Sequence, residues 1–231
     1  MFPGFPPEAL TFLRGLKRNN RREWFQPRKE IFETKVKAPM IQLVEAINAE
    51  LLDFAPEHIT DPKKAVYRIY RDTRFSADKT PYKTHVAAIF PNHGLEKHSS
   101  AGFYFHLNEK SVGIAAGSYM PGPDELRAVR AWLAENHAAF RKASRAPQKL
   151  LGKLAGSAVT RMPKGFDAAH PAEDLIRMKQ WLYWIELDAK IATTPRLLPE
   201  LVKRFRAAAP VIAMLNAPLR KAARATSPNL S

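Results

Sequence analysis

"AGFYFHLNEKSVGIAAG", residues 101–117, contains two runs with the composition of β-strands, separated by the dipeptide Glu109-Lys110. The runs 101–108 and 111–117 hold aromatic and β-branched residues, which favour extended backbone. A link this short joins antiparallel strands, because parallel neighbours need a crossover of about a dozen residues or more. We therefore predict a β-hairpin over residues 101–117, and this hairpin decides which kind of sheet the chain builds.

Three other segments have strand composition: "AVYRIY" (65–70), "HVAAIF" (85–90) and "WLYWIELD" (181–188). The first two precede the hairpin, and charged or turn-forming stretches separate them from it and from each other. Four strands with short links predict an antiparallel meander over the sheet region 64–117.

Apolar residues at helical spacing predict N-terminal helices over residues 7–52. Asn20, followed three residues later by Glu23, resembles a capping box and would start a second helix there. Pro39 is expected to kink or split that helix, because proline removes a backbone donor.

The part from 123 to 217 is predicted to be helical and mixed, starting with a helix at Pro123. Residues 145–170 have weak periodicity, which indicates a short helix followed by irregular chain. Thr194 and Pro195 suit the N-cap and first position of a last helix, bent at Pro210. We expect a loose tail over 222–231, and one α+β domain over 1–231 whose mainly antiparallel sheet is flanked by helices.

Composition excludes several classes of chemistry. The chain of 231 residues has no cysteine, so disulfides, thiolate nucleophiles and cysteine-bound metals are excluded. No apolar run is long enough to cross a bilayer and no secretory leader is visible, so we expect no membrane partner and a cytoplasmic location. Common nucleotide, dinucleotide, hydrolase and zinc-protease motifs are absent, and no cofactor is expected.

Basic residues dominate the charge of the chain, with 37 Lys and Arg against 22 Asp and Glu, a formal net charge of +15. The densest charged stretch is "YRIYRDTRFSADKTPYKTH", residues 67–85, between two apolar runs. Arg68, Arg71 and Arg74 follow one another at a spacing of three, so a loop can gather their guanidiniums around one phosphate or carboxylate.

The segment "RIYRDTRFSADKTPY" resembles a known signature, R-x-x-R-D-x-R-F-x-x-x-D/N-K-x-x-Y, of an uncharacterised family of bacterial proteins with fungal relatives. Every signature position is present, and the opening "FPGFPPEALTFLRGLKRNNRREWF" is similar to the usual beginning of that family. Its members are about as long as this chain and are classed as a domain of unknown function. The resemblance implies a family and no activity, substrate or cofactor.

We predict a pocket around residues 68–83 that recognises an anion. Such a pocket could serve as the active site of an enzyme. The ligand-binding candidates are Arg68, Arg71, Arg74, Lys79 and Lys83. The catalytic candidates are Asp72 or Asp78 as the orienting group or general base, and Tyr82 or His85 as the proton donor. The expected partner is an anionic small molecule.

Two other readings of the same residues stay open. In one, the aspartates pair with the arginines in a structural ion network; in the other, the basic loop and the C-terminal helix bind the phosphates of a nucleic acid. The histidines at 85, 93, 98 and 106 have no standard ligand spacing, so no metal is expected. Trp24, Phe25, Trp181 and Trp184 are expected in the core rather than on a stacking surface.

Overall fold

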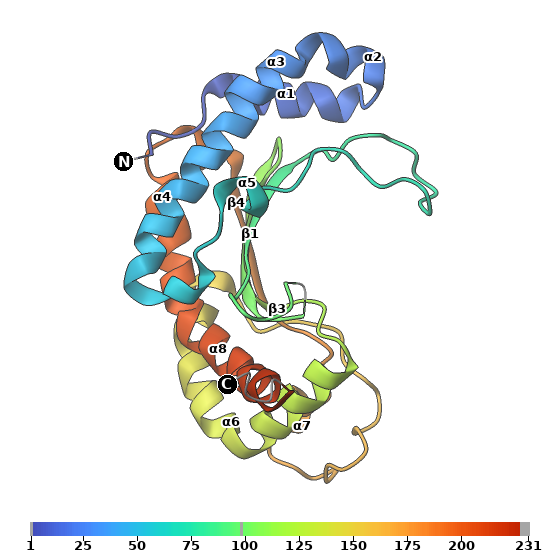
Figure 1. Ribbon diagram of the computed structural model, residues 1–231, viewed down its shortest axis with the longest axis vertical. Coiled ribbons are helices and arrows are strands. Elements are labelled where there is room, and N and C mark those ends of the chain that lie inside the picture. The colour runs from blue at the N-terminus through green and yellow to red at the C-terminus, as the bar shows by residue number, and fades with distance from the viewer. Residues whose placement is uncertain (1, 98, 227–231) are drawn as a thin grey trace.

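The computed structural model describes residues 2–97 and 99–226, with side chains as far as Arg220. Four strands form one antiparallel sheet in the order β1-β2-β3-β4 (Figure 1). Their bounds are Val86–Phe90 for β1, Gly102–Leu107 for β2, Ser111–Ser118 for β3 and Trp181–Asp188 for β4. The predicted hairpin is confirmed, since Leu107 of β2 lies opposite Val112 of β3. The α+β class is confirmed as well.

The membership of the sheet differs from the prediction at one strand. Residues 65–70 form no strand and make only isolated bridges, from Val66 to Ala88 and from Tyr70 to Tyr82. Asp61 accepts a hydrogen bond from the amide of Lys63 and starts a short helix that ends at Ala65, so the first residue of the predicted strand is helical. The fourth strand is instead β4, which pairs with β3 along its whole length.

Helices stand before the first strand, between β3 and β4, and after β4 in the chain. The helical elements before the first strand are α1 (Pro7–Arg18), α2 (Arg22–Phe25), η1 (Gln26–Arg28), α3 (Lys29–Ile31), η2 (Phe32–Lys37), α4 (Ala38–Phe54), η3 (Pro56–His58) and α5 (Pro62–Ala65). Those after β3 are α6 (Pro123–Leu151), α7 (Glu173–Ile176), η4 (Ala189–Thr193) and α8 (Leu197–Thr226). Across the described residues, no helix is long and apolar enough to span a bilayer.

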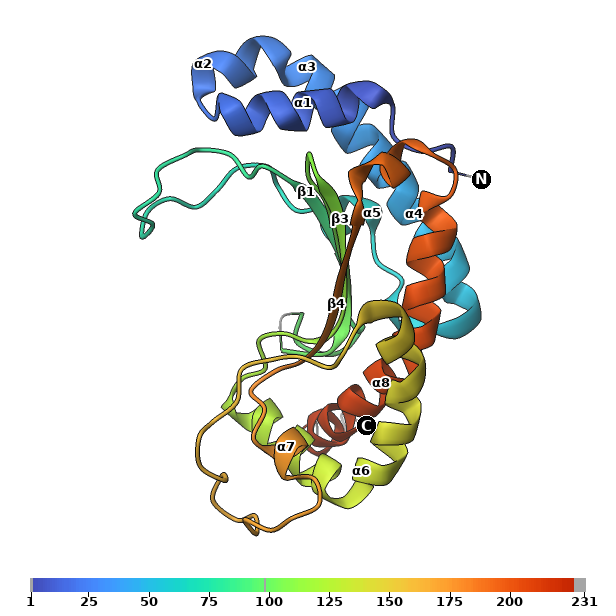
Figure 2. The same ribbon diagram turned by 180° about the vertical axis from the view of Figure 1, so that it is seen from behind.

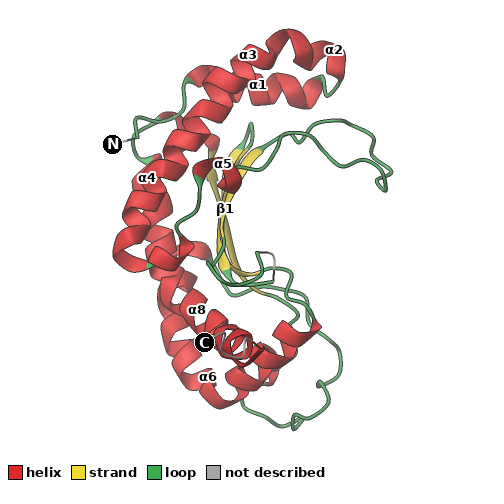
Figure 3. Ribbon diagram, in the orientation of Figure 1, coloured by secondary structure: helices red, strands yellow, loops and turns green. Residues whose placement is uncertain are grey.

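The helices cover one face of the sheet and leave the other face open (Figures 2 and 3). Alternate residues of a strand point to opposite faces, so Phe103 and Phe105 of β2 are buried on one side and Tyr104 lies on the other. Phe103 contacts Phe205 of α8 with ring centroids 4.9 Å apart, which identifies the helix-covered face as the core. The segment before β1 and loops at the strand ends extend on the side of the opposite face (Figures 2 and 3).

Several predicted helix boundaries are corrected. Asn20 does not cap α2, whose N-cap is Arg21. The side chain of Asn20 instead donates to the backbone carbonyl of Tyr82 at 2.8 Å and accepts from the backbone amide of Tyr82 at 3.1 Å. The helix containing Pro39 is split, as expected: the π-helical turn η2 precedes α4, because the proline cannot donate to the carbonyl four residues earlier.

The C-terminal helices are longer than predicted. Helix α6 continues to Leu151 without a separate short helix after 145, with Pro147 inside it and a non-helical residue at Asn136. Helix α8 starts at Leu197, while the Thr194 hydroxyl accepts from the amide of Arg196 just before it. It contains both Pro210 and Pro218 and runs through 226, so the first part of the predicted tail is helical. Residues 227–231 lie outside the described part.

Candidate functional site

The open face of the sheet is hollowed into a cleft of about 480 Å³. Strands, the segment before β1 and the loops at the strand ends all contribute to it. Its lining residues are Tyr67, Lys83, His85, Ala87, Ile89, Pro91, Lys97, Ser100, Gly102, Phe103, Tyr104, His106, Ala115, Ala116, Gly117, Tyr119, Met120, Leu182 and Trp184. A volume of this size matches that of small-molecule sites in proteins.

The cleft exists because β3 carries almost no side chains on its open face. Gly113, Ala115 and Gly117 alternate along that face, while Val112 and Ile114 point into the core. A Cβ atom at Gly113 would lie 2.7 Å from the Trp184 ring and closer still to the ring of His106. Glycine therefore lets both rings lie low across the strand between them.

Aromatic rings form the walls of the cleft. Tyr104 of β2 and Trp184 of β4 lie on either side of Ala115, with nearly parallel planes 27° apart and centroids separated by 6.5 Å. The Tyr67 ring lies 6.5 Å from that of Tyr104 and continues the row toward the segment before β1. Trp184 is 39% exposed, so the prediction that it belongs to the core is wrong, whereas Trp181 is fully buried.

Two lysines approach the cleft from opposite segments of chain. The ammonium of Lys83 lies 4.9 Å from the centroid of the Tyr67 ring, and that of Lys97 lies 5.6 Å from the same ring. Burial, together with the positive charge of Arg68, lowers the pKa of Lys83. Among the described residues that line the cleft, none is an aspartate or a glutamate. The positive charge here has no acidic counterpart within the lining.

Two histidines stand side by side at one end of the cleft. The rings of His85 and His106 are 5.2 Å apart. Burial, with the nearby His106 and Lys83, lowers the pKa of His85 to about 4, so its imidazole is neutral at neutral pH. Burial also raises the pKa of Tyr104 to about 12, and its hydroxyl lies 3.4 Å from Nδ1 of His106. These groups can accept or donate hydrogen bonds without carrying charge.

The signature residues build an arm, residues 68–83, which projects from the end of the sheet beside the cleft (Figure 1). Two backbone bonds close its base, from the amide of Lys83 to the carbonyl of Ile69 at 2.8 Å and from Arg71 to Pro81 at 2.9 Å. At its tip Phe75 is 96% exposed. The arm therefore touches the body of the protein mainly at its base.

Most charged residues of the arm bind one another. Arg71 pairs with Asp78 and also donates to the Thr80 hydroxyl, and Arg74 pairs with Asp72 at 2.7 Å. The Thr80 amide and the Arg71 guanidinium lower the pKa of Asp78 to about 2. Lys79 donates to the carbonyl of Thr73 at 2.9 Å.

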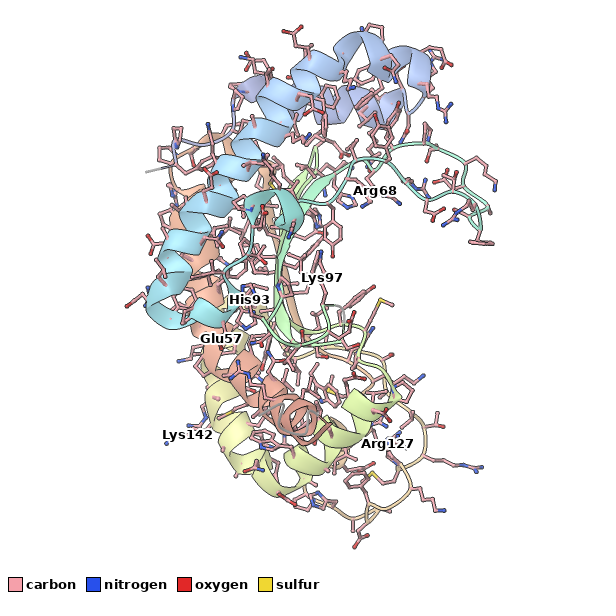
Figure 4. All side chains as sticks on the ribbon, viewed as in Figure 1. Glu57, Arg68, His93, Lys97, Arg127 and Lys142 are labelled. Atoms are coloured by element: carbon pink, nitrogen blue, oxygen red, sulfur yellow. The ribbon has the colours of Figure 1, made fainter. Side chains whose placement is uncertain are left out.

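The structure thus separates the predicted site residues into groups. Arg71, Asp72, Arg74, Asp78 and Lys79 lie together in the arm. Lys83 and His85 line the cleft, and Arg68 lies at the base of the arm on the side of the cleft (Figure 4).

Tyr82 belongs to neither group, because its ring stacks on Phe25 at 4.1 Å and is buried among the N-terminal helices. Its side chain therefore faces the core rather than the cleft. The next residue, Lys83, points the other way and lines the cleft.

Our sequence reasoning missed five lining residues with chemical character: Tyr67, Lys97, Tyr104, Tyr119 and Trp184. Two signals in residues 101–117 could have found some of them. The aromatic residues of 101–108 alternate between faces, and the run 111–117 is rich in small residues, which leaves space above the sheet. In the described part of the chain, no three His, Asp or Glu side chains are placed to hold a metal ion. His98 lies outside it.

Fold and cleft together define an α+β protein whose antiparallel sheet has one face packed by helices and one face hollowed by a ligand-sized cleft. The chain belongs to the family described as "Conserved hypothetical protein (DUF2461)", which matches residues 8–214. This agrees with the predicted resemblance to an uncharacterised conserved family. No curated protein and no solved structure matches the chain.

Proposed function

We propose that this protein binds a small organic anion in the cleft on the open face of its sheet. The observation that carries the proposal is the charge of the cleft. Lys83 and Lys97 converge on one ring, Tyr67, and the described lining contains no carboxylate to neutralise them. Lysine ammonium groups are common ligands of phosphate and carboxylate.

The energetics of the two lysines support an anionic ligand. Neither Lys83 nor Lys97 makes an ion pair with any acidic side chain of residues 2–97 and 99–220. Burial, and after it the positive charge of Arg68, lowers the pKa of Lys83, so the charged form of this lysine is disfavoured without a partner of opposite charge. An anion between the two lysines supplies that partner and adds charge-assisted hydrogen bonds.

Arg68 supplies a third positive charge. It is exposed, it makes no ion pair within the described residues, and it acts on Lys83 through its charge. Its place at the base of the arm faces the same opening that Lys97 reaches from the other side (Figure 4). We assign to it the part of the anion that projects from the cleft.

His85 is our proposed proton-transfer group for a reaction in this cleft. It is the one catalytic candidate from the sequence that lies among the lining residues, and it is uncharged at neutral pH. A neutral imidazole beside bound anion can take up or give a proton during a reaction.

Thermal-shift titration with inorganic phosphate, organic phosphates and carboxylates tests the proposal. We expect a saturable rise in Tm with at least one organic anion, because a ligand stabilises the folded state to which it binds. Lys83→Gln and Lys97→Gln should each weaken binding about tenfold or more. Lys142→Gln is the matched control, since Lys142 is exposed on α6 away from the cleft (Figure 4) and should leave affinity unchanged. The proposal fails if no anion shifts Tm, or if the cleft variants bind as the control does.

A further inference from the structure

We infer that the anion carries a planar ring, an aryl or heteroaryl group, and that this ring binds against Tyr104, His106 and Trp184. These three residues are the ring platform. The inference rests on the proposed function, because it names the chemical class of the ligand for the same cleft. Two classes of ligand share this chemistry: phosphates that carry a heteroaryl or aryl ring, such as nucleoside monophosphates, and aromatic carboxylates.

The first reason is that the platform is built of rings from β2 and β4, the two strands that flank β3. His106 lies 5.5 Å from Trp184 between ring centroids, and Tyr104 lies 6.5 Å from it. The residues of β3 between them are Gly113 and Ala115. The rings of His106 and Trp184 themselves lie over Gly113, and Ala115 adds only a methyl group. A planar group can lie over this floor in contact with ring faces, an arrangement that aromatic groups favour.

The second reason is exposure. Trp184 is 39% exposed and no described helix covers the open face, so a large apolar surface remains in contact with water (Figure 3). Tyr119 and Met120, 59% and 62% exposed, stand at the rim of the same cleft. Exposed apolar residues gathered in a cleft are typical of a binding site.

The third reason is the distance between the rings and the lysines. The row runs from Lys83 to Tyr67 at 4.9 Å, from Tyr67 to Tyr104 at 6.5 Å, and from Tyr104 to Trp184 at 6.5 Å. Cation and ring platform therefore occupy neighbouring parts of one cleft. A single ligand of modest size spans both when its anionic group and its ring are joined directly or through a short linker.

Matched pairs of anions, with and without a ring, provide the test. The pairs are phenyl phosphate with methyl phosphate, benzoate with acetate, and adenosine monophosphate with ribose 5-phosphate. We expect the ring-bearing member of at least one pair to bind about tenfold tighter or more by calorimetric titration. The pair with the largest ratio distinguishes a nucleotide from an aromatic acid.

Two substitutions locate the effect on the platform. Trp184→Ala should remove most of the preference for the ring-bearing member, and its partial exposure keeps the core intact. Gly113→Ala should do the same through a methyl group that displaces the rings of His106 and Trp184. Tyr104→Phe keeps the ring and is expected to keep the preference. The preference is the ratio of the two affinities measured for each variant, and Lys142→Gln on α6 is the control that should keep both affinities.

Each other outcome has a distinct meaning. Equal affinities within every pair, with binding that still depends on Lys83 and Lys97, would overturn the inference and leave the proposed function standing. The absence of binding by all six anions would remove the proposed function as well. Tighter binding of a single-stranded oligonucleotide than of adenosine monophosphate would overturn the assignment to a small molecule.

Discussion

Individual arginines of the arm differ in what they contact, although the sequence presents them as equivalent. Arg71 is only 25% exposed and bonds to Asp78 and Thr80 within the arm. Arg68, three residues earlier, makes no ion pair in the part of the chain described. These contacts support a structural role for Arg71 and a ligand-binding role for Arg68.

We predict that Arg71→Gln loosens the arm without unfolding the protein. The lost bonds join the arm to itself, so the urea midpoint should hardly change while the arm opens more often. Cleavage by chymotrypsin after the exposed Phe75 reports that opening and should become several times faster. Arg68→Gln is the control and should be cleaved at the rate of the unmodified protein. Equal cleavage rates for both variants would contradict the structural role of Arg71.

A second prediction concerns His85. Its pKa of about 4 in the folded protein lies below the ordinary value near 6.5, so the unfolded chain binds the extra proton first as pH falls. The contribution of His85 to stability is complete above about pH 6.5 and is lost between there and pH 4. His106 from β2 and Lys83 from the arm are the neighbouring groups that oppose its protonation.

Urea unfolding between pH 7 and pH 4 measures this contribution. His85→Gln should reduce the fall in unfolding free energy across that range by roughly 1 to 2 kcal/mol, a figure discounted for partial exposure. His106 remains in the variant, so a smaller slope persists. Lys142→Gln, on α6 away from the cleft (Figure 4), should keep the full slope. An unchanged slope in His85→Gln would mean that the imidazole is not held neutral by its surroundings.

Side-chain direction at the residue scale was partly predictable. The spacing of the arginines indicated a charged cluster, and the cluster forms, but the sequence could not show that the arginines pair with aspartates two and seven residues away. Tyr82 and Lys83 are neighbours that face opposite ways, one toward Phe25 and the other into the cleft. Only the path of the backbone through the base of the arm decides that difference.

Among the elements, the link between the N-terminal helices and the arm depends on Asn20. Its side chain both donates to the carbonyl and accepts from the amide of Tyr82, 62 residues away. The pair of bonds satisfies backbone groups at the point where the arm leaves the body, and the Tyr82 ring stacks there on Phe25. Asn20, in the link between α1 and α2, and Phe25 of α2 thereby fix the position of the arm relative to the N-terminal helices.

We predict that Asn20→Ala destabilises the protein by about 1 to 3 kcal/mol, since it leaves two partly buried backbone groups without partners. Asn19→Ala is a matched control at the preceding residue, whose side-chain amide donates to the carbonyl of Gly15 in α1. We expect this variant to lose clearly less stability than Asn20→Ala. Urea melts of both variants decide the comparison, and equal losses would show that Asn20 has no special part in holding the arm.

Strand composition and helical spacing predicted most elements, because both depend on local chemistry. Residues 101–108, 111–117 and 181–188 were recognised from their own composition and are strands in the structure. The segment 65–70 has the same composition and reaches the edge of β1, but it makes only isolated bridges, because the chain from residue 68 onward leaves the sheet to form the arm. The local sequence around Asn20 predicts a helix cap, because it gives no sign of the hydrogen-bond partner at Tyr82, which is distant in the chain.

On the scale of the whole molecule, the protein has the shape of a C, with helices along the back and the cleft on the inside (Figure 1). The net charge of +15 is spread over this surface rather than confined to the cleft. Such a charge attracts any anion over long distances, so weak binding of nucleic acid at low salt is expected on general grounds. The dependence on salt separates that attraction from specific recognition.

We therefore predict different salt responses for the two kinds of ligand. Affinity for the best small anion should fall by less than about tenfold between 50 and 200 mM salt, because only a few charges are involved. Binding to nucleic acid through about six phosphates would weaken about a thousandfold over the same range. Titrations of adenosine monophosphate and of a 20-nucleotide single strand at both salt concentrations provide the comparison. A tight complex with the single strand that is lost steeply with salt would favour the nucleic-acid function instead.

Strand β3 places packing and ligand contact on separate sides of the same backbone. Val112 and Ile114 hold the core, while Ala115 lies in the floor of the cleft. Replacing Ala115 by a larger residue would therefore change the shape of the cleft and leave the packed layer beneath it as it is. Selectivity can be redesigned, and can drift during evolution, at positions that the stability of the fold does not constrain.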